Sequence, residues 1–348
     1  VFTVGSITIN GYTGTITQNA NLSISNAGGL SGSYIQSSNA TFTATTPSTN
    51  TFSATGSFTL NTGTFRRFVG NGISVDPFII YDVYGLQAMK LATSSSYKLN
   101  NDINASVTSG WNNGAGFDPV GNSITNTYSG IFDGNNRVIS GLFVSTTTSS
   151  FVGLFGYSIN IVRNVSLLGV SITATSTAGT AGTVGAAGTS GATPTAGGTG
   201  TAGTAGSILY VGGLVGYNIG TITNVGVTGS VTGAGGAGGI AGNAGAGGNT
   251  TSGATVAGAG GVSVSNAAAT GGIVYAGGLV GFSQQGSIST ASSTATVLGT
   301  GGTGGASGNG GAGGSGSAGT AIGGAGGAVG LPGAGGIAYV GGLVGWVN

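Results

Sequence analysis

The chain has 348 residues, of which 79 are glycine, and it carries only six Lys or Arg and five Asp or Glu residues. A net charge of +1 provides no field that would recruit nucleic acid, and without His or Cys the chain cannot build disulfides, the usual zinc, haem and iron–sulfur sites, or a nucleophile–His pair. We therefore expect no cofactor and no nucleic-acid partner. Because no run of about 18 apolar residues occurs, we also expect no membrane span.

Residues 1–71 are predicted to form short strands. Apolar and hydroxyl residues alternate with period 2 in segments such as Ser6–Ile9 and Thr41–Ala44, and Gly, Asn or Ser separate these segments. The spacing fits a sandwich or a solenoid, and the charge-free, Thr-rich strands favour the start of a solenoid. The first strands are also candidates for assembly with another chain, through Val1, Phe2, Val4, Ile7 and Ile9.

Residues 72–150 hold most of the charged residues and are predicted to form the first coils of the solenoid. The apolar segment Phe78–Tyr81 reads as a strand. Asp82 follows it in the position of a helix N-cap, and apolar residues then recur at helical spacing. The sequence therefore predicts one short helix, over residues 83–91.

Three carboxylates in this region, Asp102, Asp118 and Asp133, are interpreted as turn-forming side chains. The alternatives are a calcium site or a pair of glycosidase-type carboxylates. Their spacing singles out no pair. We therefore predict no metal site and no catalytic residue.

Residues 151–348 contain an internal repeat. Gly-Leu-Phe-Gly-Tyr at 153–157 recurs three times as Gly-Leu-Val-Gly followed by an aromatic residue. Each copy is predicted to be a pair of short strands joined at Gly. Stacked copies would bury Leu on Leu and aromatic on aromatic along a solenoid core. The predicted core residues are Leu154, Leu214, Leu279 and Leu343, with Tyr157, Tyr217, Phe282 and Trp346.

These repeats resemble a known family. The element Tyr-Val-Gly-Gly-Leu-Val-Gly-Tyr at 210–217, with near-copies at 275–282 and 339–346, is similar to the GLUG repeat of bacterial surface proteins. The stretch from Asp76 to Gly134 resembles the segment that commonly precedes such repeats. The resemblance implies a right-handed parallel β-helix in a large secreted adhesin or surface protein. It also implies that some relatives carry peptidase or carbohydrate-active domains, but this sequence shows no such domain and no His-Glu-x-x-His motif.

Three glycine-rich inserts depart from the family pattern, at 178–207, 233–261 and 299–336. Gly recurs in them at every third position, which is the repeat of a polyproline II-type helix. Collagen would need abundant Pro. A flexible linker is the alternative, but it has no reason to keep this period, so we expect polyglycine II loops that pack side by side. The predicted packing glycines of the first insert are Gly179, Gly182, Gly185, Gly188 and Gly191.

The predicted fold class is thus all-β: a right-handed parallel β-helix, or β-solenoid, with one short helix and projecting Gly-rich polyproline or polyglycine II loops. The predicted function is that of a structural extracellular or cell-surface protein, as a self-assembling filament subunit or an adhesin stalk, and not an enzyme. The expected partner is another copy of the chain, with surface glycans or other cells as further candidates. An ice- or glycan-binding surface module and a polysaccharide-acting β-helix enzyme remain open as alternatives.

The prediction of self-assembly rests on the two ends of the sequence. The last repeat stops at Trp346-Val347-Asn348, before a second strand begins. The N-terminal strands of one chain would then complete the last coil of the next, which gives a head-to-tail filament. The alternative is that the chain is a piece of a longer polypeptide whose next coils supply the missing strand. A secretory signal, if there was one, is expected to have been removed.

Overall fold

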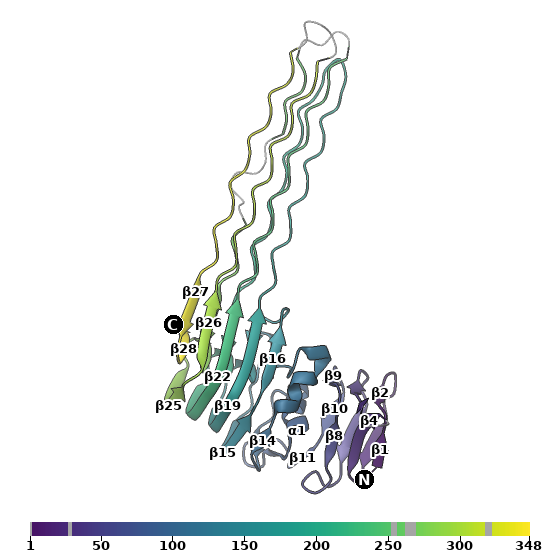
Figure 1. The fold of residues 1–348 in the computed structure, drawn as a ribbon, viewed down its shortest axis with the longest axis vertical. Coiled ribbons are helices and arrows are strands. Elements are labelled where there is room, and N and C mark those ends of the chain that lie inside the picture. Colours follow the sequence, from purple (N-terminus) through teal and green to yellow (C-terminus); the bar gives the residue numbers. More distant parts are fainter. Residues whose placement is uncertain (1, 27–29, 252–255, 262–268, 317–321) are drawn as a thin grey trace.

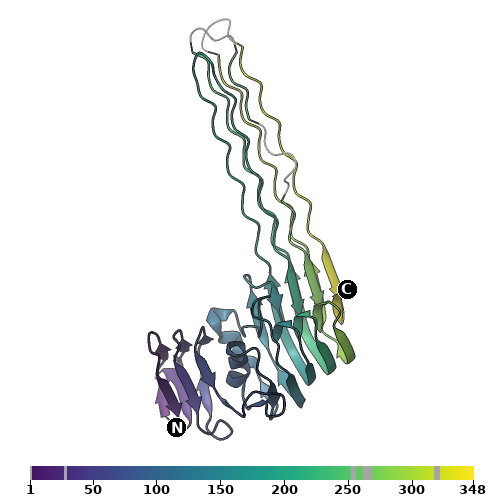
Figure 2. The same ribbon diagram turned by 180° about the vertical axis from the view of Figure 1, so that it is seen from behind.

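The chain forms a parallel β-solenoid from which a long bundle of extended segments projects (Figure 1). The computed structural model describes residues 2–26, 30–251, 256–261, 269–316 and 322–348. The strands pair mostly in parallel, and the described residues contain one short α-helix. The predicted β-solenoid class is therefore confirmed. The projecting bundle rises from the C-terminal half, and the N-terminal coils lie at the far end of the base, as the view from behind also shows (Figure 2).

The N-terminal region is built from three stacked coils. Each coil gives one strand to each of three small parallel sheets, β1-β4-β8, β2-β6-β9 and β3-β7-β10. Alternate residues of these strands face inward, and the interior is aromatic, with Phe42 stacked on Phe65 at 4.6 Å between ring centroids. The strands are β1 Phe2–Val4, β2 Ile7–Ile9, β3 Thr15–Gln18, β4 Leu22–Asn26, β5 Leu30–Ser31, β6 Tyr34–Gln36, β7 Thr41–Ala44, β8 Phe52–Ala54, β9 Phe58–Leu60 and β10 Thr64–Arg66.

The middle region joins these coils to the repeats through the helix α1, Val83–Ala88, which continues as the 3₁₀ turn η2, Met89–Leu91. Asp82 caps the helix as predicted, because its Oδ1 accepts from the Gly85 N–H at 2.8 Å. Its Oδ2 also pairs with the buried Arg67 guanidinium at 2.6 Å, a contact that ties the helix to the end of the third coil. The remaining elements here are β11 Phe68–Val69, β12 Phe78–Ile80, β13 Tyr97–Leu99, β14 Ile103–Asn104, η3 Ser106–Gly110, η4 Asn112–Gly114, β15 Phe132–Ser140 and β16 Phe143–Thr146.

The repeat region stacks its strands on three parallel sheets. One is the large sheet β11-β12-β13-β15-β19-β22-β25, and the others are β17-β20-β23-β27 and β18-β21-β24-β28. Equivalent residues of successive repeats pair directly, as in the register of Tyr210 with Tyr275 and of Tyr275 with Tyr339. The strands are β17 Phe151–Val152, β18 Phe155–Ser158, β19 Val162–Thr175, β20 Leu209–Gly212, β21 Val215–Asn218, β22 Thr221–Ala234, β23 Val274–Gly277, β24 Val280–Ser283, β25 Ser287–Ser293, β26 Thr296–Thr300, β27 Ala338–Gly341 and β28 Val344–Val347.

Two short pairings depart from the expected all-parallel arrangement. The strand β4 pairs with β5, and β11 pairs with β12, in antiparallel fashion. The second pair follows from a tight turn, in which the Asp76 N–H donates to the Ile73 carbonyl at 3.1 Å and reverses the chain. Parallel pairing resumes from β12 to β13.

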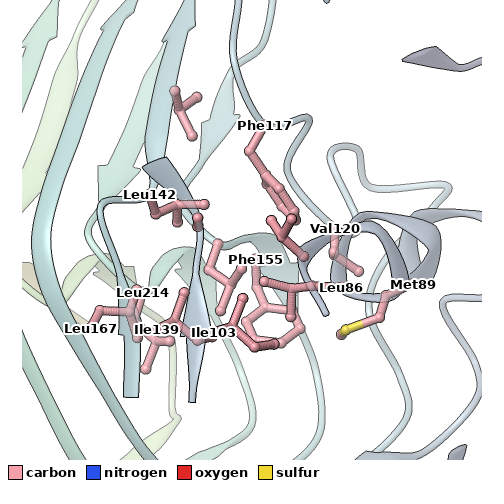
Figure 3. Close-up of a cluster of buried hydrophobic side chains, with 14 of the residues drawn as sticks. Leu86, Met89, Ile103, Phe117, Val120, Ile139, Leu142, Phe155, Leu167 and Leu214 are labelled. Atoms are coloured by element: carbon pink, nitrogen blue, oxygen red, sulfur yellow. The ribbon is translucent and has the colours of Figure 1, made fainter. Parts of the chain in front are cut away.

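The core runs through the interior of the coils from the N-terminal region into the repeats. In Figure 3, Leu86 and Met89 of the helical segment lie on one side of Phe155, and Leu167 and Leu214 lie on the other. Leu154, Leu214 and Leu279 are fully buried, whereas Leu343, beside the outermost strand of its sheet among the described residues, is only partly buried.

The four repeat aromatics are not core residues, so this prediction is corrected. Tyr157, Tyr217 and Phe282 are half-buried and Trp346 is 44% exposed. The rings do stack from repeat to repeat, with 5.0 Å between the Tyr217 and Phe282 centroids. They lie on the outer side, where they pack against a second stacked row, Phe151, Tyr210, Tyr275 and Tyr339. Tyr157 stacks on Phe151, and the other three meet this row edge-on.

The leucine ladder supplies a graded test of this packing. We expect Leu214→Ala to lower the free energy of unfolding by about 2–5 kcal/mol, because a fully buried Leu leaves a cavity between two stacked neighbours. Leu343→Ala should cost distinctly less, since that side chain is only partly buried. Urea unfolding of the two variants measures both values, and equal losses would contradict the ladder as described.

Candidate functional site: the glycine-rich mast

The three glycine-rich inserts form one bundle, which we call the mast. It has six extended limbs: limb 1 (176–190), limb 2 (195–208), limb 3 (235–250), limb 4 (256–261 and 269–273), limb 5 (301–316) and limb 6 (322–337). Limbs 1, 3 and 5 continue β19, β22 and β26, and the even-numbered limbs return to β20, β23 and β27 (Figure 1). The boundaries differ from those expected: the strands run on to residues 234 and 300, and the second insert extends to 273, with 262–268 outside the described residues.

Backbone hydrogen bonds join each limb to its neighbours at every third residue. The N–H groups of Gly182, Gly185 and Gly188 in limb 1 donate to the carbonyls of residues 240, 243 and 246 in limb 3, at 2.7–2.8 Å. Limb 3 donates in the same way to limb 5, and limb 2 donates to limb 4, which donates to limb 6. Further bonds cross between the odd- and even-numbered limbs, as from Gly242 N–H to the Thr201 carbonyl at 2.8 Å. The limbs therefore satisfy one another's backbone N–H and carbonyl groups. If these groups were left unpaired, the few apolar side chains could not compensate for the cost.

Glycine is required where limbs touch. A Cβ added to Gly179, Gly182, Gly185 or Gly188 would lie 1.8–2.2 Å from a carbonyl oxygen of limb 2. No side chain can occupy such a position. Gly191 differs, because nothing lies within 4 Å of its added Cβ at the top of the limb, although its N–H still donates to the Asn249 carbonyl. Four of the five predicted packing glycines thus face a neighbouring backbone, and Gly191 does not.

Threonine hydroxyls close the edge formed by limbs 1 and 2. The N–H groups of Thr180, Thr183 and Thr189 donate to the Oγ1 atoms of residues 204, 201 and 195 at 2.6–2.8 Å. One limb later, the corresponding N–H groups of Gly239, Gly242 and Gly248 donate to the carbonyls of those same limb 2 threonines. At this edge the threonine Oγ1 atoms therefore accept the hydrogen bonds that carbonyl oxygens of a neighbouring limb accept inside the bundle. The sequence analysis missed this role, because the pairing depends on which limbs lie side by side.

The broad faces of the mast are uncharged and carry small or apolar side chains. Val184, Ile240 and Leu331 are 68%, 56% and 65% exposed. The outward rows contain Ala, Val, Ile, Leu, Thr, Ser and Asn but no Gly: they are 178, 181, 184, 187 and 190 in limb 1, 237, 240, 243, 246 and 249 in limb 3, 303, 306, 309, 312 and 315 in limb 5, and 322, 325, 328, 331, 334 and 337 in limb 6.

The candidate carboxylates have structural partners and do not face one another as a pair. Asp118 pairs with Lys90, and Asp133 pairs with Arg163 at 3.0 Å. Asp102 accepts from the Val138 N–H at 2.9 Å. Within the described part of the chain, no three acidic residues come together as a group that could hold a metal ion.

Tyr210 in the outer aromatic rows has a raised pKa. Burial and the neighbouring Tyr217, Tyr275 and Tyr157 hydroxyls raise the pKa of Tyr210 to about 12. Because the unfolded-state pKa is about 10, the resulting stabilisation is fully present below pH 10 and is lost as the pH rises through about 12. Tyr210 is therefore neutral at pH 7 and contributes to the rows through packing.

The candidate assembly strands form the first coil of their own chain. β1 pairs with β4, and β2 pairs with β6. Val4 and Ile7 line an apolar hollow of about 370 Å³ at this end of the solenoid, together with Ile16, Leu22, Tyr34 and Phe42, while Ile9 is buried. Val1 lies outside the described residues, and Phe2 contributes its backbone to β1.

Comparison with known proteins finds the GLUG motif in this chain, at residues 200–232. Halomucin from Haloquadratum walsbyi is 41% identical over 134 residues, which are 35% of this chain and 1% of Halomucin. A candidate Gly-rich membrane protein from Evansella cellulosilytica is 30% identical over 119 residues, which are 32% of this chain and 13% of that protein. The chain thus spans a small part of either relative. The resemblance to GLUG-repeat proteins is confirmed.

A solved structure, that of a candidate immunoglobulin A1 protease from Bacteroides ovatus, aligns with 80% of this chain and 64% of its own length. Sequence identity is 18% and the TM-score is 0.38. Among the described residues, no helix combines the length and the apolar character needed to cross a membrane.

Two neighbouring positions of limb 1 test the packing of the mast. We expect Gly185→Val to disrupt the bundle, because its Cβ would lie 2.2 Å from the Gly198 carbonyl oxygen. Thr183→Val should matter far less, since Thr183 is exposed and the new side chain has nearly the same shape. Amide hydrogen exchange across residues 176–208 and 235–250 measures the difference, and similar exchange in both variants would refute close packing at Gly185.

Proposed function

We propose that this chain is a non-enzymatic structural module of a cell-surface protein, in which a β-solenoid base holds a rigid stalk of polyglycine II limbs. The observation that carries the proposal is the bonding of limbs from three different inserts at every third residue. A flexible linker would not use one insert to satisfy the backbone of the next. The GLUG motif and the similarity to a Gly-rich membrane protein support a location outside the cell or at its surface.

The solenoid explains how such a stalk can be stable. Ordering a glycine costs more conformational entropy than ordering any other residue, so a single glycine-rich loop would not hold one shape in water. Parallel strands lie about 4.8 Å apart, and β19, β22 and β26 start the three ascending limbs at this spacing. The base therefore places the limbs in bonding register. At about 3.1 Å per residue, a limb of about 15 residues reaches roughly 45 Å from the base.

The absence of charge in the mast suits this role better than catalysis. All Lys, Arg and Asp residues lie between 66 and 163, and the three candidate carboxylates described above have structural partners. A long uncharged projection attracts and repels few solutes, and it can carry a binding surface away from the cell without electrostatic attraction to ions or polymers.

Immunogold electron microscopy of producing cells tests the proposal, with an antibody raised against limb 5 and limb 6. We expect label outside the cell and at a distance from the membrane, and label confined to the cytoplasm would contradict it. Purified protein should also leave immunoglobulin A1 and acidic polysaccharides uncleaved while control enzymes cleave them. Turnover of either substrate would replace the structural function by an enzymatic one.

Head-to-tail assembly is a second candidate function, supported by the apolar hollow at the first coil. Val4, Ile7, Ile16 and Leu22 are only partly buried there, and an apolar surface of this kind favours a covering partner. A second copy whose last coil stacks on β1, β2 and β3 would cover the hollow and continue the sheets.

A matched pair of substitutions in β2 tests this assembly. We expect Ile7→Asp to reduce self-association at least tenfold, because it places a charge in the hollow. Thr8→Asp, whose side chain is exposed on the opposite face of the strand, should leave self-association unchanged. Sedimentation velocity and negative-stain microscopy measure both. Filaments of equal length and number from the two variants would exclude the hollow as the contact.

A further inference from the structure

The two edges of the mast are closed to different extents. Hydroxyls of limb 2 close the edge of limbs 1 and 2, as described above. At the opposite edge, Gly310 and Gly313 of limb 5 are equivalent to residues 244 and 247 of limb 3. The N–H groups of residues 244 and 247 donate to carbonyls of limb 5. Within the described residues, neither Gly310 nor Gly313 donates to another limb.

The facing carbonyls at this edge also accept no N–H from the described limbs. The carbonyls of Gly258 and Gly261 in limb 4 accept from limb 5, at 2.9 Å each. Gly324 and Gly327 are their counterparts in limb 6, and no described N–H donates to their carbonyls. The donors of limb 5 and the acceptors of limb 6 thus continue, in the same register, the interface that the inner limbs already make.

Nothing in the described part of the chain requires glycine at position 326. Its added Cβ would have 3.8 Å of clearance to the nearest atom, and its backbone does not have positive φ. One repeat earlier, Gly260 is required, because its added Cβ would lie 1.9 Å from the Gly311 oxygen of limb 5. The outward rows of the mast avoid glycine, whereas this row has glycine at 323, 326 and 335, each with at least 3.5 Å of clearance. In the upper half of the limb, glycine at 323 and 326 leaves room for a further limb that the described residues do not supply.

Val329 sets the lower limit of this free edge. It lies one period below Gly326 in the same row and is 60% exposed, so its side chain would meet any limb that continued toward the base. Pro332, one period further, has no N–H to donate. Only the upper half of the edge, from Gly310 to Gly313 and from residue 323 to 327, can therefore take up an added segment.

We propose that this upper edge of limbs 5 and 6 binds a short glycine-repeat segment of a different polypeptide, rather than of a second copy of this chain, in the polyglycine II conformation and parallel to limb 5. The segment accepts from the N–H groups of Gly310 and Gly313 and donates to the carbonyls of Gly324 and Gly327. It needs glycine at every third residue, because limb backbones approach too closely for a Cβ. This interaction rests on the proposed stalk and gives its tip a defined class of partner.

The test is an NMR titration of isotope-labelled full-length chain with a peptide that has the sequence of residues 308–316. We expect the amide signals of Gly310 and Gly313 to shift and saturate, while those of Gly301 and Gly304 stay in place. The variant Gly326→Val should weaken binding at least tenfold, because its side chain fills the place of the peptide. Gly335→Val is the matched control, since it is equally exposed, has 3.6 Å of clearance and lies below Val329.

Three outcomes would overturn the proposal: no saturable shift, equal binding by the Gly326→Val variant, or equal shifts at Gly301 and Gly304. A concentration-dependent shift of Gly310 and Gly313 without peptide would assign the edge to a second copy of this chain, which also overturns it. Protection of the inner Gly242 and Gly245 amides from hydrogen exchange, measured on the same samples, reports separately on the mast. If those amides are protected and no peptide binds, the binding edge fails while the stalk stands.

Discussion

Backbone pairing between limbs is the interaction on which the mast depends. Its residues are mainly Gly, Ala, Thr and Ser, which bury little apolar area, and each ordered residue costs about 1–2 kcal/mol of conformational entropy. A buried N–H or carbonyl without a partner would add to that cost. The structure meets this constraint by bringing six limbs together, so that the inner limbs 3 and 4 have bonded neighbours on several sides. At the closest contacts between limbs the residue must then be glycine, because a neighbouring carbonyl lies where a Cβ would be.

The base and the mast are coupled through this requirement. The solenoid stacks β19, β22 and β26, and the limbs that continue these strands inherit their spacing. Leu154, Leu214 and Leu279 hold the stack from inside, and the paired aromatic rows hold it from outside. The N-terminal coils join the same core through α1, where Arg67 and Asp82 form their ion pair. A loss of packing in the base would therefore disturb the register of the hydrogen bonds between limbs.

Periodicity in the sequence predicted the features that repeat. The four Gly-Leu-x-Gly elements gave the leucine ladder, the glycine period of three gave the contact face of limb 1, and Asp82 gave the start of the helix. Features that depend on which segments become neighbours were not predictable in this way. The hydroxyl caps need Thr183 beside Thr201, and the Arg67–Asp82 pair joins residues of different coils. The outward position of Tyr217 depends on its contact with Tyr210, which strand alternation alone does not indicate.

Residue-resolved amide hydrogen exchange on the intact chain tests the central claim most directly. If the limbs form one bonded bundle, the N–H groups of Gly242 and Gly245, which donate to limb 2, should exchange far more slowly than those of an unstructured glycine peptide. Gly301 and Gly304, at the edge, should exchange quickly in the same sample. Exchange of Gly242 and Gly245 at the unstructured rate would contradict the account, because the limbs would then be independent flexible loops.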